Sequence, residues 1–397
     1  MDIVDALRGF SLAGIVIVHM VENYIGAPTP EGALEATHIG IPDYIVDGII
    51  FLFLRGKFFA LFSFLFGLSF FIQMDKAHQK GQDFRMRFLW RLLILLAIGY
   101  LHSLFYRGDI LTIYALLGVL LIPFFNLKNS WVLGISTLLF LGLGRFVVFL
   151  VYGGANLFME GDFSPSSPEI ITYFDILRNG SLLDVFQTNA WKGHLMKLDF
   201  QFGVFSRGYL TFGFFLLGLL FGRIEFFRNY LVLTSKVKKG IYWSIGLFFV
   251  SFILAIVSFA QLGENVSFDN WPAMLGLTAF DINNIAMTFI IVGLFVLAYK
   301  KDKWQQRLTY FIPYGRMALT NYVLQSLIGT FIFYGWGMQL VGELRNTYTF
   351  LIAILLVLVQ ILISKWWMQH FYYGPFEWLW RSLTYFKVYP LRKRKTG

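Results

Sequence analysis

A histidine and an aspartate stand on either side of a short gap between two apolar runs. His102 lies near the end of the run 89–106, and Asp109 begins the next run, 109–126. Ionisable groups in or near hydrocarbon are costly, by about 2.5–3.5 kcal/mol each on insertion scales, and they usually mark function. A histidine that is hydrogen-bonded to a carboxylate is also a common general base. The pair therefore indicates chemistry or transport at one face of a membrane.

A second histidine and a second carboxylate are expected at the same depth. His19 lies near the end of the first apolar run, and Glu22 follows it by about one helical turn. A single histidine in a membrane helix is often only a hydrogen-bonded contact between helices. Two histidines and two carboxylates on one side of the membrane favour a site, and we assign His102, Asp109 and His19 to catalysis.

Cations also occur inside the apolar runs. Arg55 and Lys57 lie about ten residues inside the run 46–74, which at 1.5 Å per residue is about 15 Å deep. They need an anionic partner, a carbonyl-lined cavity or water, so they indicate either a functional pocket or a structural ion pair. Arg207 is expected to snorkel at the outer boundary, and Arg145 to snorkel or to pair with a carboxylate.

A third group of polar residues follows a break in the run 309–336. Arg316 is expected to begin a helix after Pro313-Tyr314-Gly315, where free N–H groups and the guanidinium together suit a phosphate. Simple anchoring at the cytoplasmic surface is the alternative. Asn321 and Gln325 are four residues apart, so they share a helix face and either line a site or join helices.

The elements that must position these residues are membrane-spanning helices. Of the 397 residues, 57% are apolar and only 14% are charged, against about 25% charged in soluble proteins. Runs of about 20 apolar residues are the unit of a span. Ten such runs predict an all-α, polytopic transmembrane helix bundle with a single domain: 8–26, 46–74, 89–106, 109–126, 130–153, 207–224, 241–262, 271–299, 309–336 and 348–368.

Basic residues predict the orientation of this bundle. One set of helix ends carries 23 lysines and arginines and the other set carries 5. Because cytoplasmic loops are enriched in Lys and Arg, both termini should be cytoplasmic. The same rule makes 369–397 a cytoplasmic basic tail and 154–206 an extracytoplasmic loop or cap.

Several chemistries leave no signature in the chain. There is no cysteine, so disulfides, thiolate metal sites and a cysteine-linked acyl intermediate are excluded. No phosphate-binding loop, dinucleotide glycine motif or G-x-S-x-G occurs, and the six histidines lack metal-ligand spacing. We therefore expect no metal and no nucleic-acid partner, and we attribute the net charge of +10 mainly to topology.

Five stretches together resemble the YeiB-like family of bacterial membrane proteins: LRGFSLAGIVIVHM, GKFFALFSFLFGLSF, LLILLAIGYLHSLFYRGDILTIYALLGVLL, GRMALTNYVLQSLIGTFIFY and GPFEWLWRSLTY. The resemblance runs from residue 7 to about 392 and is weakest across 125–205 and 225–300. That family resembles transmembrane acyltransferases such as heparan-alpha-glucosaminide N-acetyltransferase. The resemblance implies a multi-pass protein of the bacterial inner membrane. It would move an acyl group, expected to be acetyl, from cytoplasmic acetyl-CoA to an outer acceptor such as a sugar or a lipid-linked glycan.

The resemblance also implies roles for individual residues. The positions that carry over are Arg8, Lys57, His102, Asp109, Arg316, Asn321 and Gln325. Of these, we assign Lys57, Arg316, Asn321 and Gln325, together with Arg55 from its own position in the second apolar run, to binding of the acyl-CoA donor. Glu22 and Arg8 would bind the acceptor. His19 departs from the family pattern, in which asparagine is expected, and this makes it a less secure base than His102.

Two other classes of function remain open. A transporter or flippase could carry an anionic small or lipid-linked substrate past Arg55 and Lys57. A structural or sensory membrane protein would use its buried charges only as ion pairs. Turnover of acetyl-CoA distinguishes the enzyme from both. Membrane lipids are expected partners in every case, and a homo-oligomer is compatible with all three.

Overall fold

A computed structural model describes residues 1–154, 156–158, 165–263 and 268–394. Within these ranges all regular secondary structure is helical, apart from one isolated bridge between Phe371 and Arg392. The prediction of an all-α fold is therefore confirmed. The elements are α1 (Asp2–Val21), η1 (Glu35–Thr37), α2 (Ile41–Ile49), η2 (Ile50–Leu54), α3 (Phe58–His78), α4 (Arg85–Phe105), α5 (Leu111–Leu121), η3 (Pro123–Asn126), α6 (Asn129–Phe140), α7 (Leu143–Tyr152), α8 (Pro168–Asn179), α9 (Leu182–Ala190), α10 (Lys192–Phe202), α11 (Arg207–Arg223), α12 (Thr234–Phe259), α13 (Trp271–Tyr299), α14 (Asp302–Leu308), α15 (Phe311–Arg316), α16 (Ala318–Phe333), α17 (Asn346–His370) and α18 (Pro375–Tyr385).

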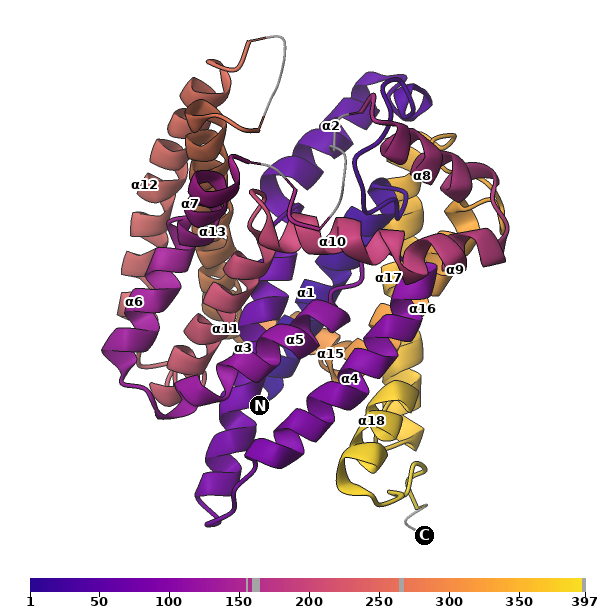
Figure 1. Cartoon of the computed structure of the whole chain (residues 1–397). Coiled ribbons are helices and arrows are strands. Elements are labelled where there is room, and N and C mark those ends of the chain that lie inside the picture. Colours follow the sequence, from indigo (N-terminus) through magenta and orange to yellow (C-terminus); the bar gives the residue numbers. More distant parts are fainter. Residues whose placement is uncertain (155, 159–164, 264–267, 395–397) are drawn as a thin grey trace.

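The long helices run between two ends of the molecule. Figure 1 shows the N-terminus and α18 in the lower part of the view, and α2, α8 and the tips of α12 and α13 toward the top. The first helix is central and packs against α3, α15, α16 and α17. By contrast, α12 packs chiefly on α13, and most of its large apolar side chains are exposed. Such a face suits contact with lipid.

Six helical segments in the described ranges are long and apolar enough to cross a membrane: α1, the segment 41–78 (α2, η2 and α3), α4, α12, α13 and α17. The pairs α6–α7 and α10–α11 are bent by 55° and 62°, and counting each pair as one span gives eight. The chain is thus a multi-pass membrane protein with six to eight candidate spans. The two remaining predicted spans, 109–126 and 309–336, contain the shorter apolar helices α5 and α16.

The predicted interruption of the second span is present. A π-helical turn, Ile50–Leu54, ends α2, and α3 begins at Phe58. Between them Gly56 has φ +82°, and a Cβ at that position would lie 2.9 Å from the side-chain oxygen of Asn284. Glycine is therefore needed for both its backbone conformation and the close approach of α13. Lys57 satisfies a freed carbonyl, because its Nζ donates to the oxygen of Phe51 at 2.6 Å.

The ninth predicted span breaks later than expected. Pro313 and Gly315 lie inside α15, which ends at Arg316, and α16 begins at Ala318. The prediction that Arg316 begins a helix is therefore wrong. The reason is that proline is tolerated in the first turn of a helix, so Pro313, the third residue of α15, does not break it.

Two helix crossings are held by close backbone contact. A Cβ added to Gly67 of α3 or to Gly218 of α11 would lie 2.0 Å from a backbone oxygen of the facing helix. Gly9 of α1 and Gly315 of α15 meet in the same way, at 2.3 and 1.9 Å. Small residues let membrane helices approach closely enough for strong van der Waals packing. These crossings fix α1 and α3, which border the candidate site.

A buried ion pair joins α7 to α13. Arg145 pairs with Asp281 and also donates to Thr278 Oγ1 at 2.6 Å and to the carbonyl of Val204 at 2.7 Å. Its side chain is 1% exposed. Of the two alternatives that the sequence left open for Arg145, the structure therefore has the pair with a carboxylate and not snorkelling.

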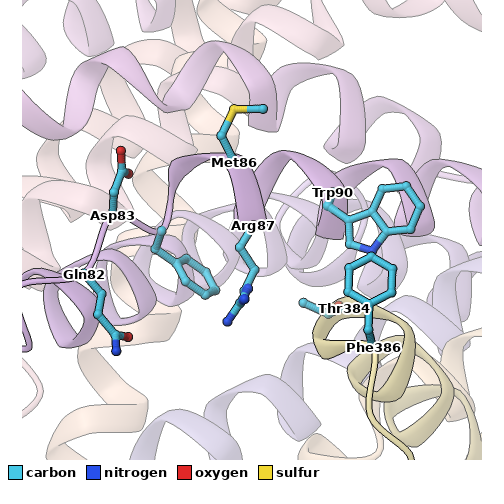
Figure 2. A pocket seen from close by; sticks show the side chains of 8 residues that line it. Gln82, Asp83, Met86, Arg87, Trp90, Thr384 and Phe386 are labelled. Carbon is cyan, nitrogen blue, oxygen red and sulfur yellow. The ribbon is translucent and has the colours of Figure 1, made fainter.

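The tail folds back as α18 on the N-terminal half of α4. Trp90 Nε1 donates to the carbonyl of Leu383 at 3.0 Å, and the Trp90 ring stacks on Phe386 with centroids 5.4 Å apart. Figure 2 shows this contact at the wall of a hollow beside Arg87 and Asp83. The predicted basic tail thus contains a docked helix, and Lys395 at its end lies outside the described residues.

Candidate functional site

His102 and Asp109 form a buried hydrogen-bonded pair. His102 Nδ1 lies 2.8 Å from Asp109 Oδ1, and the two side chains are 1% and 0% exposed. The last turn of α4 carries the histidine. The connection to α5 carries the aspartate, whose oxygens accept from the N–H groups of Leu111 at 3.1 Å and Thr112 at 3.0 Å. The first turn of α5 therefore holds the carboxylate in place, because helix N-termini favour negative charge.

This arrangement leaves one histidine nitrogen free to react. A carboxylate only accepts hydrogen bonds, so the Nδ1 of His102 carries the proton toward Asp109. The other nitrogen, Nε2, is buried and has no hydrogen-bond partner among the described residues. An unpaired buried acceptor is uncommon and needs an explanation. Proton acceptance at Nε2 is one such explanation, since Asp109 would stabilise the resulting imidazolium.

A lysine from another part of the chain completes the group. Lys197 of α10 lies with its Nζ 3.9 Å from Asp109 Oδ2 and donates to Thr112 Oγ1 at 2.9 Å. Thr112 in turn donates to Asp109 Oδ2 at 3.1 Å. In Figure 1, α10 lies across the long helices, and this places its side chains against the α4–α5 connection. Residues 165–206 of the predicted outer loop 154–206 are mostly helical, as α8, α9 and α10, and they contribute Lys197 to the site.

A cavity of about 550 Å³ lies beside this group. It is lined by residues 25–29 and 37–38 of the α1–α2 connection, and also by Phe62 of α3 and Tyr114 of α5. Side chains able to do chemistry line it, including His19, Glu22, Arg55, Asp109, Lys197 and Tyr322. His102 lies behind this wall, and its ring packs on that of Tyr322 with centroids 5.1 Å apart.

The second predicted pair is split between two partners. His19 Nδ1 lies 2.9 Å from the hydroxyl of Tyr106, whereas Glu22 accepts from Arg55 Nε at 2.6 Å. Arg55 is also 3.8 Å from Asp47. The structure thus places His19, Glu22 and Asp109 at one cavity. Glu22 forms its ion pair with Arg55 and not with His19.

The other residues assigned from the sequence lie apart from this cavity. Arg8 and Arg316 meet at Asp5: Arg8 is 2.9 Å from its Oδ1, and Arg316 is 3.4 Å from its Oδ2 and 3.0 Å from Asp2. Arg316 is about half exposed there. The expectation that free N–H groups at a helix start would bind a phosphate beside Arg316 is not met. In the first turn of α16, the N–H groups of Leu319 and Thr320 already donate to Glu377.

The two predicted amides of α16 are both buried and differ in their partners. Asn321 donates to Ser364 Oγ of α17 at 2.9 Å, which joins two helices. Gln325 is 0% exposed, and neither its oxygen nor its nitrogen has a partner among the described residues. The orphaned amide of Gln325 is therefore the better candidate for contact with a bound molecule.

Sequence reasoning missed three cavity residues. Lys197 and Arg107 were counted only as outer-loop charges, and Arg207 only as a snorkelling residue. In the structure Arg107 is 5% exposed, and its guanidinium binds the carbonyl of Gly26 at 2.7 Å. The only signal in the sequence was that few basic residues lie on the predicted outer side, so that each of them stands out. Within the described ranges no three or more His, Asp or Glu side chains are arranged to hold a metal ion.

The fold and site define an all-helical, multi-pass membrane protein with a buried His–Asp–Lys group beside a polar cavity. Residues 221–387 match the family model described as "Protein of unknown function (DUF418)". The chain is 30% identical to "Uncharacterized protein YxaH" of Bacillus subtilis (strain 168), over 99% of this chain and 96% of the relative. It is 26% identical to "Uncharacterized protein YeiB" of Escherichia coli (strain K12), over 96% and 95%. The chain therefore belongs to the YeiB-like family.

Proposed function

We propose that this protein is a membrane acyltransferase that moves an acetyl group from cytoplasmic acetyl-CoA to an acceptor on the opposite side of the membrane. The observation that carries the proposal is the buried His102–Asp109 pair with its unpartnered Nε2. The resemblance of the YeiB-like family, to which the five stretches are similar, to transmembrane acyltransferases is what suggests this activity. A sugar or lipid-linked glycan is the expected acceptor.

In the proposed reaction, His102 acts as general base. Its Nε2 accepts the proton of an acceptor hydroxyl or amine as the acceptor atom bonds to the acetyl carbonyl carbon. The thioester C–S bond then breaks, and the departing sulfur takes the proton back from His102 as free CoA forms. Asp109 holds the ring and stabilises its positive charge throughout, which is the usual division of roles in such pairs.

Access to His102 requires a path past Tyr322. The tyrosine lines the cavity and covers the histidine ring, while its hydroxyl accepts from the N–H of Ile110 at 3.3 Å. Tyr322 is only 2% exposed, so opening a path from the cavity to His102 requires this buried side chain to rotate. His19 lines the cavity directly and is the alternative base within this proposal.

The donor would bind along α15 and α16. The amide of Gln325 lacks partners, and it suits an amide of the pantetheine arm of CoA. Asn321 lies one turn away on the same face. Arg316 would contact the phosphates, although these must displace Asp2 or Asp5 from it. Lys57 and Arg55 would lie deeper on the route to the acetyl group.

The direction of transfer depends on a ten-span topology with cytoplasmic termini. The basic asymmetry of 23 to 5 supports it. The contacts of α18 with α4 agree, because they join two of the basic segments at one end of the molecule. In this topology α5 and α16 cross the membrane as short helices, and the location would be the bacterial inner membrane.

Release of CoA tests the proposal directly. Purified protein in nanodiscs is given acetyl-CoA, with water as the acceptor, and free thiol is measured by a colorimetric reagent. The chain has no cysteine, so only released CoA reacts. His102→Ala should lose about 10²–10⁴-fold of the rate, whereas the control His78→Ala, at the far end of α3, should keep it. No turnover by the native protein, together with uptake of an anionic solute into proteoliposomes, would favour a transporter instead.

A further inference from the structure

Arg207 faces the cavity without a polar partner. It is the first residue of α11 and lines the cavity wall just after the 62° bend from α10. Its guanidinium lies over the ring of Phe59, 3.8 Å from the centroid. Among the described residues it has no side-chain hydrogen bond and no ion pair. Stacking on one face leaves the N–H groups at its edge free, which is the geometry that binds an oxyanion through two parallel hydrogen bonds.

The carboxylates around Arg207 already have other partners. Glu22 pairs with Arg55, and Asp281 pairs with Arg145. Lys57 lies in the same neighbourhood and reaches only a backbone carbonyl. The cluster therefore contains four cations and three anions, namely Arg55, Lys57, Arg145 and Arg207 against Glu22, Asp47 and Asp281. A cation at low dielectric is costly without a counter-charge, so an anion would stabilise this cluster.

A second polar group at the cavity independently indicates a ligand. Gln201 is 5% exposed, and its side-chain oxygen is buried with no hydrogen-bond partner among the described residues. It lies one helical turn after Lys197 on α10, so both share a face, and both line the cavity. An orphaned acceptor of this kind calls for a donor such as a hydroxyl or an amine.

We propose that the cavity binds a molecule that carries both an oxyanion and a hydroxyl or amine. Arg207 binds the oxyanion, a phosphate or a carboxylate, and Gln201 accepts from the hydroxyl or amine. That this molecule is the acetyl acceptor rests on the proposed function, whereas the binding itself does not. The acceptor class is then an anionic polyol, sugar or amine derivative, either free or joined to a lipid.

Calorimetric titration of the protein in zwitterionic nanodiscs tests the binding without any acyl donor. Three probes separate the chemistries: glycerol 3-phosphate, glycerate and neutral glycerol. Wild-type protein should bind at least one of the two anions and should not bind glycerol measurably. Arg207→Gln should weaken binding of that anion by at least about tenfold, as expected for a lost charge-assisted hydrogen bond. Arg228→Gln, an exposed arginine paired with Glu225, should leave it unchanged.

A lipid source is tested by adding phosphatidylglycerol and counting retained lipids by native mass spectrometry. Retention of this lipid by wild type, with loss in Arg207→Gln, assigns the oxyanion to a lipid headgroup and makes the acceptor lipid-linked. Equal binding of every probe and lipid by wild type and Arg207→Gln, or no binding by either, overturns the proposal. Because no acetyl-CoA is present, either result is independent of whether the protein transfers acetyl groups.

Discussion

His102 Nδ1 lies 2.8 Å from Asp109 Oδ1, and this hydrogen bond joins the last turn of α4 to the start of α5. The other carboxylate oxygen faces Lys197, whose Nζ is 3.9 Å away. Elements from separate parts of the chain thus meet at one aspartate. The histidine retains a free nitrogen, and that combination is what acid–base chemistry needs.

Replacement of Lys197 should impair turnover more than folding. Lys197→Met keeps an unbranched chain but removes the charge beside Asp109 and the hydrogen bond to Thr112. Charge-assisted contacts contribute about 1.5–3 kcal/mol, so we expect CoA release to fall about tenfold or more. Lys192→Met, an exposed residue of the same helix, is the control. Equal rates for the two variants would remove Lys197 from the site.

Loss of either partner of the Arg145–Asp281 pair should destabilise the protein strongly. Both side chains are buried, and removing one leaves an uncompensated charge, at a cost of about 3–5 kcal/mol. Arg145→Met and Asp281→Asn are compared with the double variant by unfolding in detergent. The double variant should lose less than the sum of the two. Glu225→Gln, which breaks an exposed pair, is the control. If the single variants at Arg145 and Asp281 unfold at the same point as this control, the buried pair contributes little to stability.

Glu377 should make stability depend on pH. This carboxyl on α18 is buried, and burial raises its pKa above the usual 4.5, although hydrogen bonds from Thr320 and Leu319 act in the opposite direction. The folded state therefore binds a proton more tightly than the unfolded state. Its contribution to stability is fully present below pH 4.5 and declines as pH rises through the folded-state pKa.

Glu377→Gln should remove that decline, because glutamine does not titrate. The melting temperature of wild type relative to Glu377→Gln should fall as pH rises from 4 toward neutrality, measured by scanning fluorimetry in detergent at about half-unit steps. Glu343→Gln, at an exposed carboxyl paired with Arg178, serves as the control. Parallel melting curves for wild type and Glu377→Gln across this range would show that Glu377 keeps an ordinary pKa.

Cysteine accessibility should place the two ends of the molecule on opposite sides. Asn156→Cys in the predicted outer loop and Lys238→Cys in a basic segment are made singly in a chain with no native cysteine. An impermeant maleimide applied to intact cells should label only the first of the two, and both should react after permeabilisation. Labelling of both in intact cells would contradict the orientation and the direction of transfer.

The sequence alone predicted the elements that depend on local pattern. The apolar runs predicted the helical class. The interruption at Arg55-Gly56-Lys57 was predictable because two charged residues and a glycine lie within an apolar run long enough to span the membrane. The His102–Asp109 contact was also predictable, since a short connection between antiparallel helices brings its two ends together. Pro313 was misread because the same residue that breaks a helix interior also begins a helix.

Long-range partners could not be predicted in this way. Nothing local indicates that Lys197 reaches Asp109, because α10 must first turn across the bundle. Arg207 was interpreted as a snorkelling residue, since its distance along α11 from the boundary is short. Its cavity position depends on the bend after Phe202 and on packing against Phe59. Both depend on tertiary structure that periodicity does not encode.

A double-mutant cycle on CoA release tests the catalytic pair most directly. His102→Ala and Asp109→Asn should each lower the rate per folded protein by about 10²–10⁴-fold. The double variant should lose little more than either single one, because the two residues act as a unit. Full additivity of the two losses, or a His102→Ala protein that releases CoA at the wild-type rate, would contradict acyl transfer by this pair.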